Sequence, residues 1–359
     1  MTVEENMINT PAEKDYILEV DGLKQYFPVK KDFLGRPLAY LRAVDGVSFK
    51  LERGKTLGIV GESGCGKTTL GRTILRLYDV HDGSAVYTTT DEAGNRKSVD
   101  LAKLSKSALR DLRTELQLIF QDPYSSLPPR MTVGAIIGES VRVHKIVPDS
   151  EVGAYVRSVM KRCGLQEHHY DRYPHEFSGG QRQRICIARA LAVKPNLVIC
   201  DEPVSALDVS IQAQIINLLK KLQREEQMSY LFISHDLSVV KYISDNIAVM
   251  YLGNIVEMGS TADICGGAKH PYTQALFSAV PIANPHNKSK PEMLEGELPS
   301  PANPPKGCKF HTRCKHCTDQ CREVPPTPVE VEPGHFVACH LYGGSPVSQE
   351  QQINEKEEN

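Results

Sequence analysis

The residues with the clearest chemical potential form a glycine-rich segment, Gly61–Thr68, with the sequence Gly-Glu-Ser-Gly-Cys-Gly-Lys-Thr. It matches the pattern G-x-x-x-x-G-K-[ST], in which backbone N–H groups close around phosphates. Lys67 can neutralise the β- and γ-phosphate oxygens, and the Thr68 hydroxyl can bind Mg²⁺. The segment therefore predicts a site for a nucleoside triphosphate. The predicted contacts are Gly61, Glu62, Ser63, Gly64, Cys65, Gly66, Lys67, Thr68 and Thr69.

Two adjacent acids, Asp201 and Glu202, follow the apolar run 197–200. A buried strand that ends in two carboxylates can direct one toward Mg²⁺ and the other toward an attacking water. We expect Asp201 to be the acid on the metal side and Glu202 to be the general base. Two acids at a strand end can also be merely solvated, but the Lys67 loop gives them a common target.

These groups can meet only if strands bring them to one edge of a sheet. Four short apolar runs, each followed by polar residues, are typical of buried parallel strands: 57–60, 116–120, 197–200 and 230–233. A helical pattern follows the loop at 69–76, and helical spacing within 131–172 predicts a helical insertion. The chain from 16 to 282 thus has the pattern of an α/β fold with a largely parallel sheet and sites at the strand ends.

The composition limits the function classes. The 359 residues include 40% hydrophobic and 24% charged residues and carry a formal charge of −2, which is ordinary for a globular protein and gives no basic excess for nucleic acid. The polar start does not resemble a secretory signal, and no apolar run approaches membrane-spanning length. We therefore expect a cytosolic chain, or one bound to a membrane only through partners, with reduced cysteines.

One further motif, Phe177-Ser178-Gly179-Gly180-Gln181, resembles the signature of the ATP-binding cassette (ABC) ATPases. It precedes a helical pattern at 181–192, whose N-terminal N–H groups suit a phosphate, although a simple helix cap has the same residues. The resemblance implies a P-loop ABC ATPase fold and two cassettes that face head to tail. Ser178, Gly179, Gly180 and Gln181 would then contact the ATP of the partner cassette.

The other motifs of this family fall in order along the chain. Gln121 resembles the Q-loop glutamine, which touches Mg²⁺ or water and links the site to membrane subunits. Asp208 ends a segment that resembles the D-loop at the dimer interface, and His235 resembles the histidine that senses the γ-phosphate. With Glu202, the resemblance makes Gln121 and His235 the catalytic set, and Thr68, Gln121 and Asp201 the Mg²⁺ ligands.

The resemblance also implies a site for the base and ribose of ATP. Phe27 resembles the aromatic residue that stacks on adenine, with Tyr26 as the alternative, and Val44 is placed to contact ribose or base. A core role for these residues is equally open.

Longer stretches resemble the ATPases of oligopeptide and dipeptide importers: 121–131, 172–181, 201–214 and 270–276. The resemblance extends over about 16–341, and segment 294–305 indicates the F-type subunit. It implies ATP-driven peptide import by a peripheral protein at the cytoplasmic face of the inner membrane. The implied partners are a D-type ATPase in a heterodimer, two membrane permeases and an extracytoplasmic peptide-binding protein. The alternatives are an importer ATPase for nickel or opines, a soluble ABC protein acting on ribosomes or DNA, and an iron–sulfur redox sensor.

A proline-rich segment near the end holds five of the ten cysteines. It predicts a small, separate, loop-rich extension that needs bound metal or another cross-link for stability. The family pattern falls on Cys308, Cys314, Cys321 and Cys339 and implies a [4Fe-4S] cluster. The pair Cys314-x-x-Cys317 with Cys308, Cys321, His311 or His316 could instead hold Zn²⁺, and unligated thiols are a third possibility. The remaining cysteines are expected to pack as small apolar residues.

The predicted organisation has four parts. These are a polar segment at 1–15, the ATPase domain at 16–282 with a helical subdomain at about 122–190, the cysteine-containing extension at 283–342, and a polar tail at 343–359.

Overall fold

The structure is a computed structural model, which describes residues 14–31, 37–90, 95–279, 294 and 296–343. The predicted tail at 343–359 lies outside the described residues except for Gly343. All but two residues of the polar segment at 1–15 and the predicted boundary at 282/283 also lie outside them. No helix in the described ranges is both long and apolar enough to cross a membrane.

The larger of two sheets has eight strands in the order β11-β12-β10-β9-β3-β8-β7-β6. The strands from β9 to β6 pair in parallel, and those from β9 to β11 pair antiparallel. Their bounds are β3 Thr56–Val60, β6 Leu116–Ile119, β7 Leu197–Asp201, β8 Ser229–Ile233, β9 Asn246–Tyr251, β10 Asn254–Ser260, β11 Val329–Glu332 and β12 His335–Val337. The four strands predicted from apolar runs are therefore confirmed.

Both faces of the central strands are buried, which explains why these strands have continuous apolar sequences rather than alternating ones. In β8, Tyr230 and Phe232 enter the core shared with the helical insertion, whereas Leu231 and Ile233 enter the core beneath the second sheet. The side chains alternate between faces along a strand. One strand thus joins two hydrophobic cores.

The second sheet is antiparallel, with the order β2-β1-β4-β5, and the sequence did not predict it. Its strands are β1 Tyr16–Lys31, β2 Pro37–Glu52, β4 Asp82–Thr90 and β5 Arg96–Asp100. Helix α2 (Lys106–Asp111) follows this sheet in the chain, with the 3₁₀ turns η1 (Leu101–Lys103) and η2 (Leu112–Thr114) on either side.

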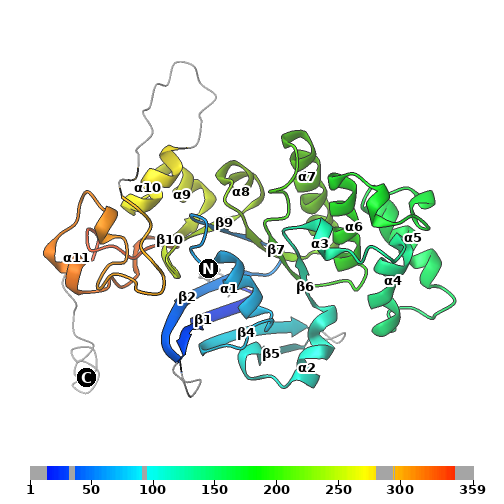
Figure 1. Ribbon diagram of the computed structural model, residues 1–359, viewed down its shortest axis with the longest axis horizontal. Coiled ribbons are helices and arrows are strands. Elements are labelled where there is room, and N and C mark those ends of the chain that lie inside the picture. Colours follow the sequence, from blue (N-terminus) through cyan, green and yellow to red (C-terminus); the bar gives the residue numbers. More distant parts are fainter. Residues whose placement is uncertain (1–13, 32–36, 91–94, 280–293, 295, 344–359) are drawn as a thin grey trace, which may run out of the picture.

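The helices over the main sheet include α1 (Lys67–Ile74), which follows the glycine-rich loop as predicted. The others are α7 Val209–Glu226, α8 Leu237–Ile243, α9 Thr261–Gly267 and α10 Pro271–Ser278. The predicted helical insertion is confirmed at one end of the molecule (Figure 1). It contains α3 Pro123–Ser126, α4 Val133–Val143, α5 Val152–Arg162, η3 Glu167–His169, η4 Pro174–Glu176 and α6 Gly179–Leu191.

The cysteine-containing extension lies at the opposite end of the molecule (Figure 1). In its described residues the extension contains only short elements, η5 (His311–Arg313), α11 (Asp319–Glu323) and the hairpin β11–β12. This agrees with the expectation of a loop-rich extension. It is not structurally separate, however, because β12 pairs with β10 and continues the main sheet. The two paired strands lie far apart in sequence, so the proline pattern of the extension could not predict their pairing.

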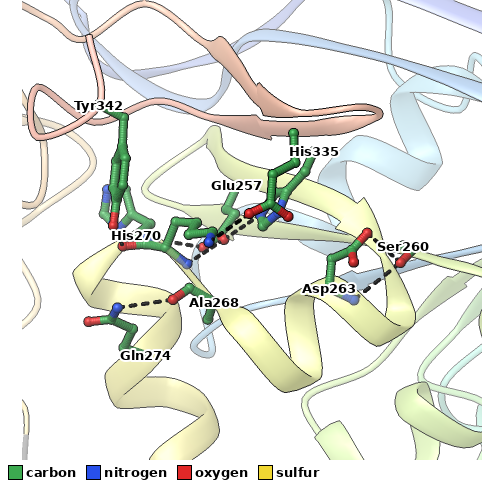
Figure 2. A network of polar contacts seen from close by, with 10 residues as sticks. Glu257, Ser260, Asp263, Ala268, His270, Gln274, His335 and Tyr342 are labelled. Carbon is green, nitrogen blue, oxygen red and sulfur yellow. Dashed lines mark hydrogen bonds and ion pairs between the residues drawn. The ribbon is translucent and has the colours of Figure 1, made fainter.

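A buried polar network attaches this hairpin to the rest of the molecule. Figure 2 shows the side chains of Glu257 and His335 pointing toward each other, with Glu257 Oε1 and His335 Nε2 2.8 Å apart. Both side chains are fully buried. The Glu257 carboxylate also accepts hydrogen bonds from the backbone N–H groups of Lys269 (2.7 Å) and His270 (2.9 Å). Three hydrogen-bond donors offset the cost of burying the Glu257 carboxylate. This network therefore attaches the extension to β10.

Candidate functional site

The glycine-rich loop lies between β3 and α1, and its glycines permit close contacts with neighbouring backbone. Gly61 has φ 150°, and a Cβ there would lie 2.1 Å from the carbonyl oxygen of Met250. Gly66 has φ 108°, and a Cβ there would lie 2.0 Å from the carbonyl oxygen of Ala43. Side chains at these two positions would displace the loop from β9 and β2.

Gly66 is also the N-cap of α1, and no side chain caps this helix. The first N–H groups of α1 therefore remain available to an anion, as the phosphate-binding prediction requires. The Lys67 ammonium donates to the carbonyl oxygens of Gly61 (2.7 Å) and Glu62 (2.9 Å). These contacts hold the buried Lys67 side chain across the loop.

Thr68 and Asp201 lie together as a magnesium site would require. The Thr68 hydroxyl donates to Asp201 Oδ1 at 2.7 Å, and Asp201 is buried. Burial raises the pKa of the Asp201 carboxyl; the hydrogen bond from Thr68 and the charge of Arg72 act in the opposite direction. A hydroxyl and a buried carboxylate that lacks full charge compensation suit Mg²⁺, which prefers oxygen ligands. The residues present therefore fit this ion.

Three polar side chains converge where β6, β7 and β8 end. Gln121 Nε2 donates to Glu202 Oε2 at 2.9 Å, and His235 Nδ1 lies 3.1 Å from the same oxygen. Glu202 has φ 46°, a left-handed conformation that costs a non-glycine residue about 1–3 kcal/mol. Its N–H donates to the carbonyl oxygen of Ile233 at 2.9 Å, which holds it in this conformation. The parallel strands thus bring all three predicted catalytic residues together.

These three residues and the loop line a single hollow of about 550 Å³. The hollow is of the size that small-molecule sites usually have. Five lining residues had not been predicted: Leu41, Arg42, Ala43, Gly253 and Pro301. No local motif marks them, because they reach the hollow from β2, the β9–β10 turn and the extension.

The residues predicted to contact the base and ribose do not line this hollow. Phe27 contacts Tyr78 edge to face, with ring centroids 5.2 Å apart, and Val44 is fully buried in the core. Tyr26 lines a neighbouring hollow beside Tyr40 and Arg42. The predicted roles of Phe27 and Val44 therefore remain expectations, and the structure places Val44 where its side chain packs among apolar neighbours.

The signature residues lie away from the hollow. Ser178 is exposed and caps α6; it accepts from the N–H of Gln181 at 3.4 Å, while the Gln181 side chain accepts from the N–H of Ser178 at 3.1 Å. Asp208 is exposed at the start of α7, beside Val209, whose side chain is 81% exposed. None of these residues lines the hollow at the loop of the same chain. The exposure of Ser178 and Asp208 leaves these two residues accessible to a second cassette.

The cysteines of the extension lie near one another. Burial, with smaller contributions from the neighbouring thiols of Cys321, Cys339 and Cys314, raises the pKa of Cys308 to about 12. Cys317 in turn contributes to the raised pKa of Cys314. The N–H of Cys308 also donates to the carbonyl oxygen of Cys321 at 2.8 Å. Among the described residues, however, no three histidine, cysteine or acidic side chains lie close enough to share one metal ion.

The cysteines outside the extension are mostly in the core, as predicted. Cys65, Cys163, Cys186 and Cys200 are buried, and burial raises the pKa of each thiol. Cys265 is half-buried.

Comparison with known proteins gives two family matches. Residues 44–205 match the ABC transporter family, and residues 256–321 match the C-terminal region of oligopeptide/dipeptide transporters. The chain is 51% identical to the oligopeptide transport ATP-binding protein AppF of Bacillus subtilis, over 93% of this chain and 99% of that protein. It is 49% identical to the oligopeptide transport ATP-binding protein OppF of Escherichia coli, over 90% of this chain and 95% of that protein.

Solved structures agree on the fold. The ATP-binding cassette MJ0796, in a post-hydrolysis state bound to ADP and Pi, superposes with a TM-score of 0.58 at 23% identity. The match covers 68% of this chain and 98% of the cassette. The structure of cbiO1 from Clostridium perfringens, part of an ABC transporter complex, gives a TM-score of 0.57 at 26% identity, over 71% of this chain and 92% of that one.

Proposed function

The chain belongs to the ATP-binding subunits of oligopeptide and dipeptide ABC transporters, and we propose that it hydrolyses ATP to energise peptide import through a membrane. The observation that carries this proposal is the convergence of Gln121, Glu202 and His235 on the hollow lined by the Lys67 loop. Such a site joins a phosphate-binding loop to a general base.

In this proposal the loop binds the ATP phosphates, and Thr68, Asp201 and Gln121 hold Mg²⁺, which neutralises charge on the phosphates when bound. Glu202 accepts a proton from the attacking water. Gln121 and His235 hold the Glu202 carboxylate in place, and His235 is exposed enough to meet the γ-phosphate.

We further propose that the working unit is a heterodimer with a D-type ATPase. The segment Ser178–Gln181, which begins with the exposed Ser178, and the exposed Asp208 would complete the partner's ATP site, because they lie outside the hollow of their own chain. The heterodimer would bind two permeases at the cytoplasmic face of the inner membrane and act with an extracytoplasmic peptide-binding protein. The division into an ATPase domain at 16–282 and an extension at 283–342 is part of the same proposal.

The transport proposal can be tested with the complete transporter in vesicles. We expect uptake of a labelled oligopeptide or dipeptide only when ATP and Mg²⁺ are present on the side of this chain. The related cargoes serve as the comparison: accumulation of nickel or an opine without peptide uptake would replace the peptide proposal. ATP hydrolysis with no uptake of any of these would favour a soluble ABC protein.

We propose that Cys308, Cys314, Cys321 and Cys339 hold a [4Fe-4S] cluster that staples the extension. The thiols of Cys321, Cys339 and Cys314 all contribute to the raised pKa of Cys308, which indicates that these four lie near one another. Cys317 also lies near Cys314, so the choice of these four over Cys317 rests on the family pattern. A single zinc ion requires its ligands to converge on one point, whereas a cluster spreads four thiolates over four irons. Among the described residues no three histidine, cysteine or acidic side chains are placed to share one ion, so the proposal of a cluster rests on the family pattern of these cysteines.

Metal content tests this assignment. We expect anaerobically purified protein to contain iron and acid-labile sulfide, and Cys321→Ser to lose most of both, because a cluster that loses one thiolate ligand is less stable. Cys317→Ser is the matched control in the same segment and should keep the iron. A colourless protein with zinc that Cys317→Ser removes would establish the zinc site instead.

A further inference from the structure

The phosphate loop and the cysteine-rich extension are joined by a two-pronged ion pair across 251 residues of sequence. Arg313 donates from its two terminal nitrogens to the two carboxylate oxygens of Glu62, at 2.8 and 3.0 Å. The Arg313 side chain is 7% exposed and that of Glu62 is 25% exposed. Two parallel hydrogen bonds fix both the orientation of the Glu62 carboxylate and its distance from Arg313. A lysine in place of Arg313 would not fix the orientation.

Glu62 is the second residue of the loop, and its backbone is fixed on both sides. Its N–H donates to the hydroxyl of the buried Tyr272 at 2.9 Å, and its carbonyl oxygen accepts from the Lys67 ammonium at 2.9 Å. A shift of Glu62 would therefore move an atom that holds Lys67. The carboxylate of Glu62 is the part of this residue that the extension controls.

Arg313 itself is held rigidly. Phe310, three residues before Arg313, is buried against Tyr251 and Tyr272, with ring centroids 5.3 and 5.4 Å away. Lys309 pairs with Asp45 at 2.8 Å and donates to the carbonyl oxygen of Leu252 at 2.9 Å. The segment that presents Arg313 is thus anchored on the main body, between Cys308 and Cys314.

We propose that Arg313 is a positioning residue for nucleotide binding, through which the cysteine-rich extension controls the affinity of the phosphate loop for ATP. The proposal rests on the function proposed above for the loop. This role goes beyond holding the extension in place, because the extension contacts the phosphate loop itself and not only the edge of the main sheet. Coupling of this kind is reciprocal, so bound ATP should also stabilise the attachment of segment 308–314.

The test is equilibrium binding of the magnesium complex of a non-hydrolysable ATP analogue to the full chain. We expect Arg313→Met to raise the Kd on the order of tenfold, because small misplacements of binding groups are costly. Arg313→Lys keeps the charge but loses one of the two parallel hydrogen bonds. Its Kd should lie between those of Arg313→Met and wild type. Glu62→Gln provides a second route to the same effect if Arg313→Met does not fold. The exchange Glu62→Arg with Arg313→Glu should recover part of the affinity.

Lys269→Met is the matched control, because Lys269 pairs with Glu332 of the extension at 2.9 Å and makes no contact with the loop. It should leave the Kd unchanged. If Arg313→Met and Glu62→Gln bind the analogue as tightly as wild type, or if Lys269→Met weakens binding equally, Arg313 has no positioning role. If the wild-type chain itself does not bind the analogue, the proposed function fails instead, so the two failures can be distinguished.

Discussion

Replacing Glu202 with glutamine is expected to reduce ATP turnover by about a thousandfold, the contribution typical of a general base. Glutamine preserves the size of the side chain and its hydrogen bond with Gln121 but cannot accept the proton of the attacking water. Nucleotide binding should persist, since the loop residues are unchanged. We therefore expect the ATP-bound pair of cassettes to accumulate. Phosphate release measures the first effect, and sedimentation with ATP measures the second.

Glu225→Gln is a suitable control, because Glu225 is an acid on α7 whose ion pair with Lys221 is well exposed. It should hydrolyse ATP at the wild-type rate. Turnover by Glu202→Gln close to that of wild type would show that another group activates the water. The left-handed φ of Glu202 would then be explained by the surrounding structure that holds it, since strained residues are found often, but not only, at active sites.

Removal of the Glu257 side chain is expected to destabilise the protein by about 3–5 kcal/mol, as is usual when one partner of a buried pair is lost. Glu257→Ala would leave His335 and two backbone N–H groups without their acceptor in the core (Figure 2). The extension should detach from β10 first. Chemical denaturation measures the loss, and limited proteolysis should show early cleavage within the extension.

Glu332→Ala removes an acid from the same network at its surface. Its ion pair with Lys269 is 2.9 Å long, and the Glu332 side chain is 52% exposed. Exposed pairs contribute at most about 1 kcal/mol, so this variant should be nearly as stable as wild type. Equal losses for Glu257→Ala and Glu332→Ala would mean that the buried carboxylate is not what attaches the hairpin.

Most of the residues that line the hollow at the Lys67 loop could be named from sequence, because they belong to short segments with recognisable spacing. The loop at 61–68 needs glycines at fixed spacing, and the acids Asp201 and Glu202 directly follow an apolar strand. Parallel strands with both faces buried are continuous apolar runs, which made β3, β6, β7 and β8 recognisable. The antiparallel sheet β2-β1-β4-β5 lacks that signal, since β5 has no buried residue in its pattern.

Tertiary structure alone decided how the parts are joined. Glu62 with Arg313, and Glu257 with His335, are pairs of ordinary polar residues that lie far apart in sequence, so no local pattern indicates their contact. The proline-rich pattern of the extension predicted short elements correctly, but it contained no information about β12 pairing with β10. The sequence by itself therefore determined the fold class, the phosphate loop and its acids, because local spacing specifies them. The attachment of the extension to the loop depends on long-range packing, which only the folded chain defines.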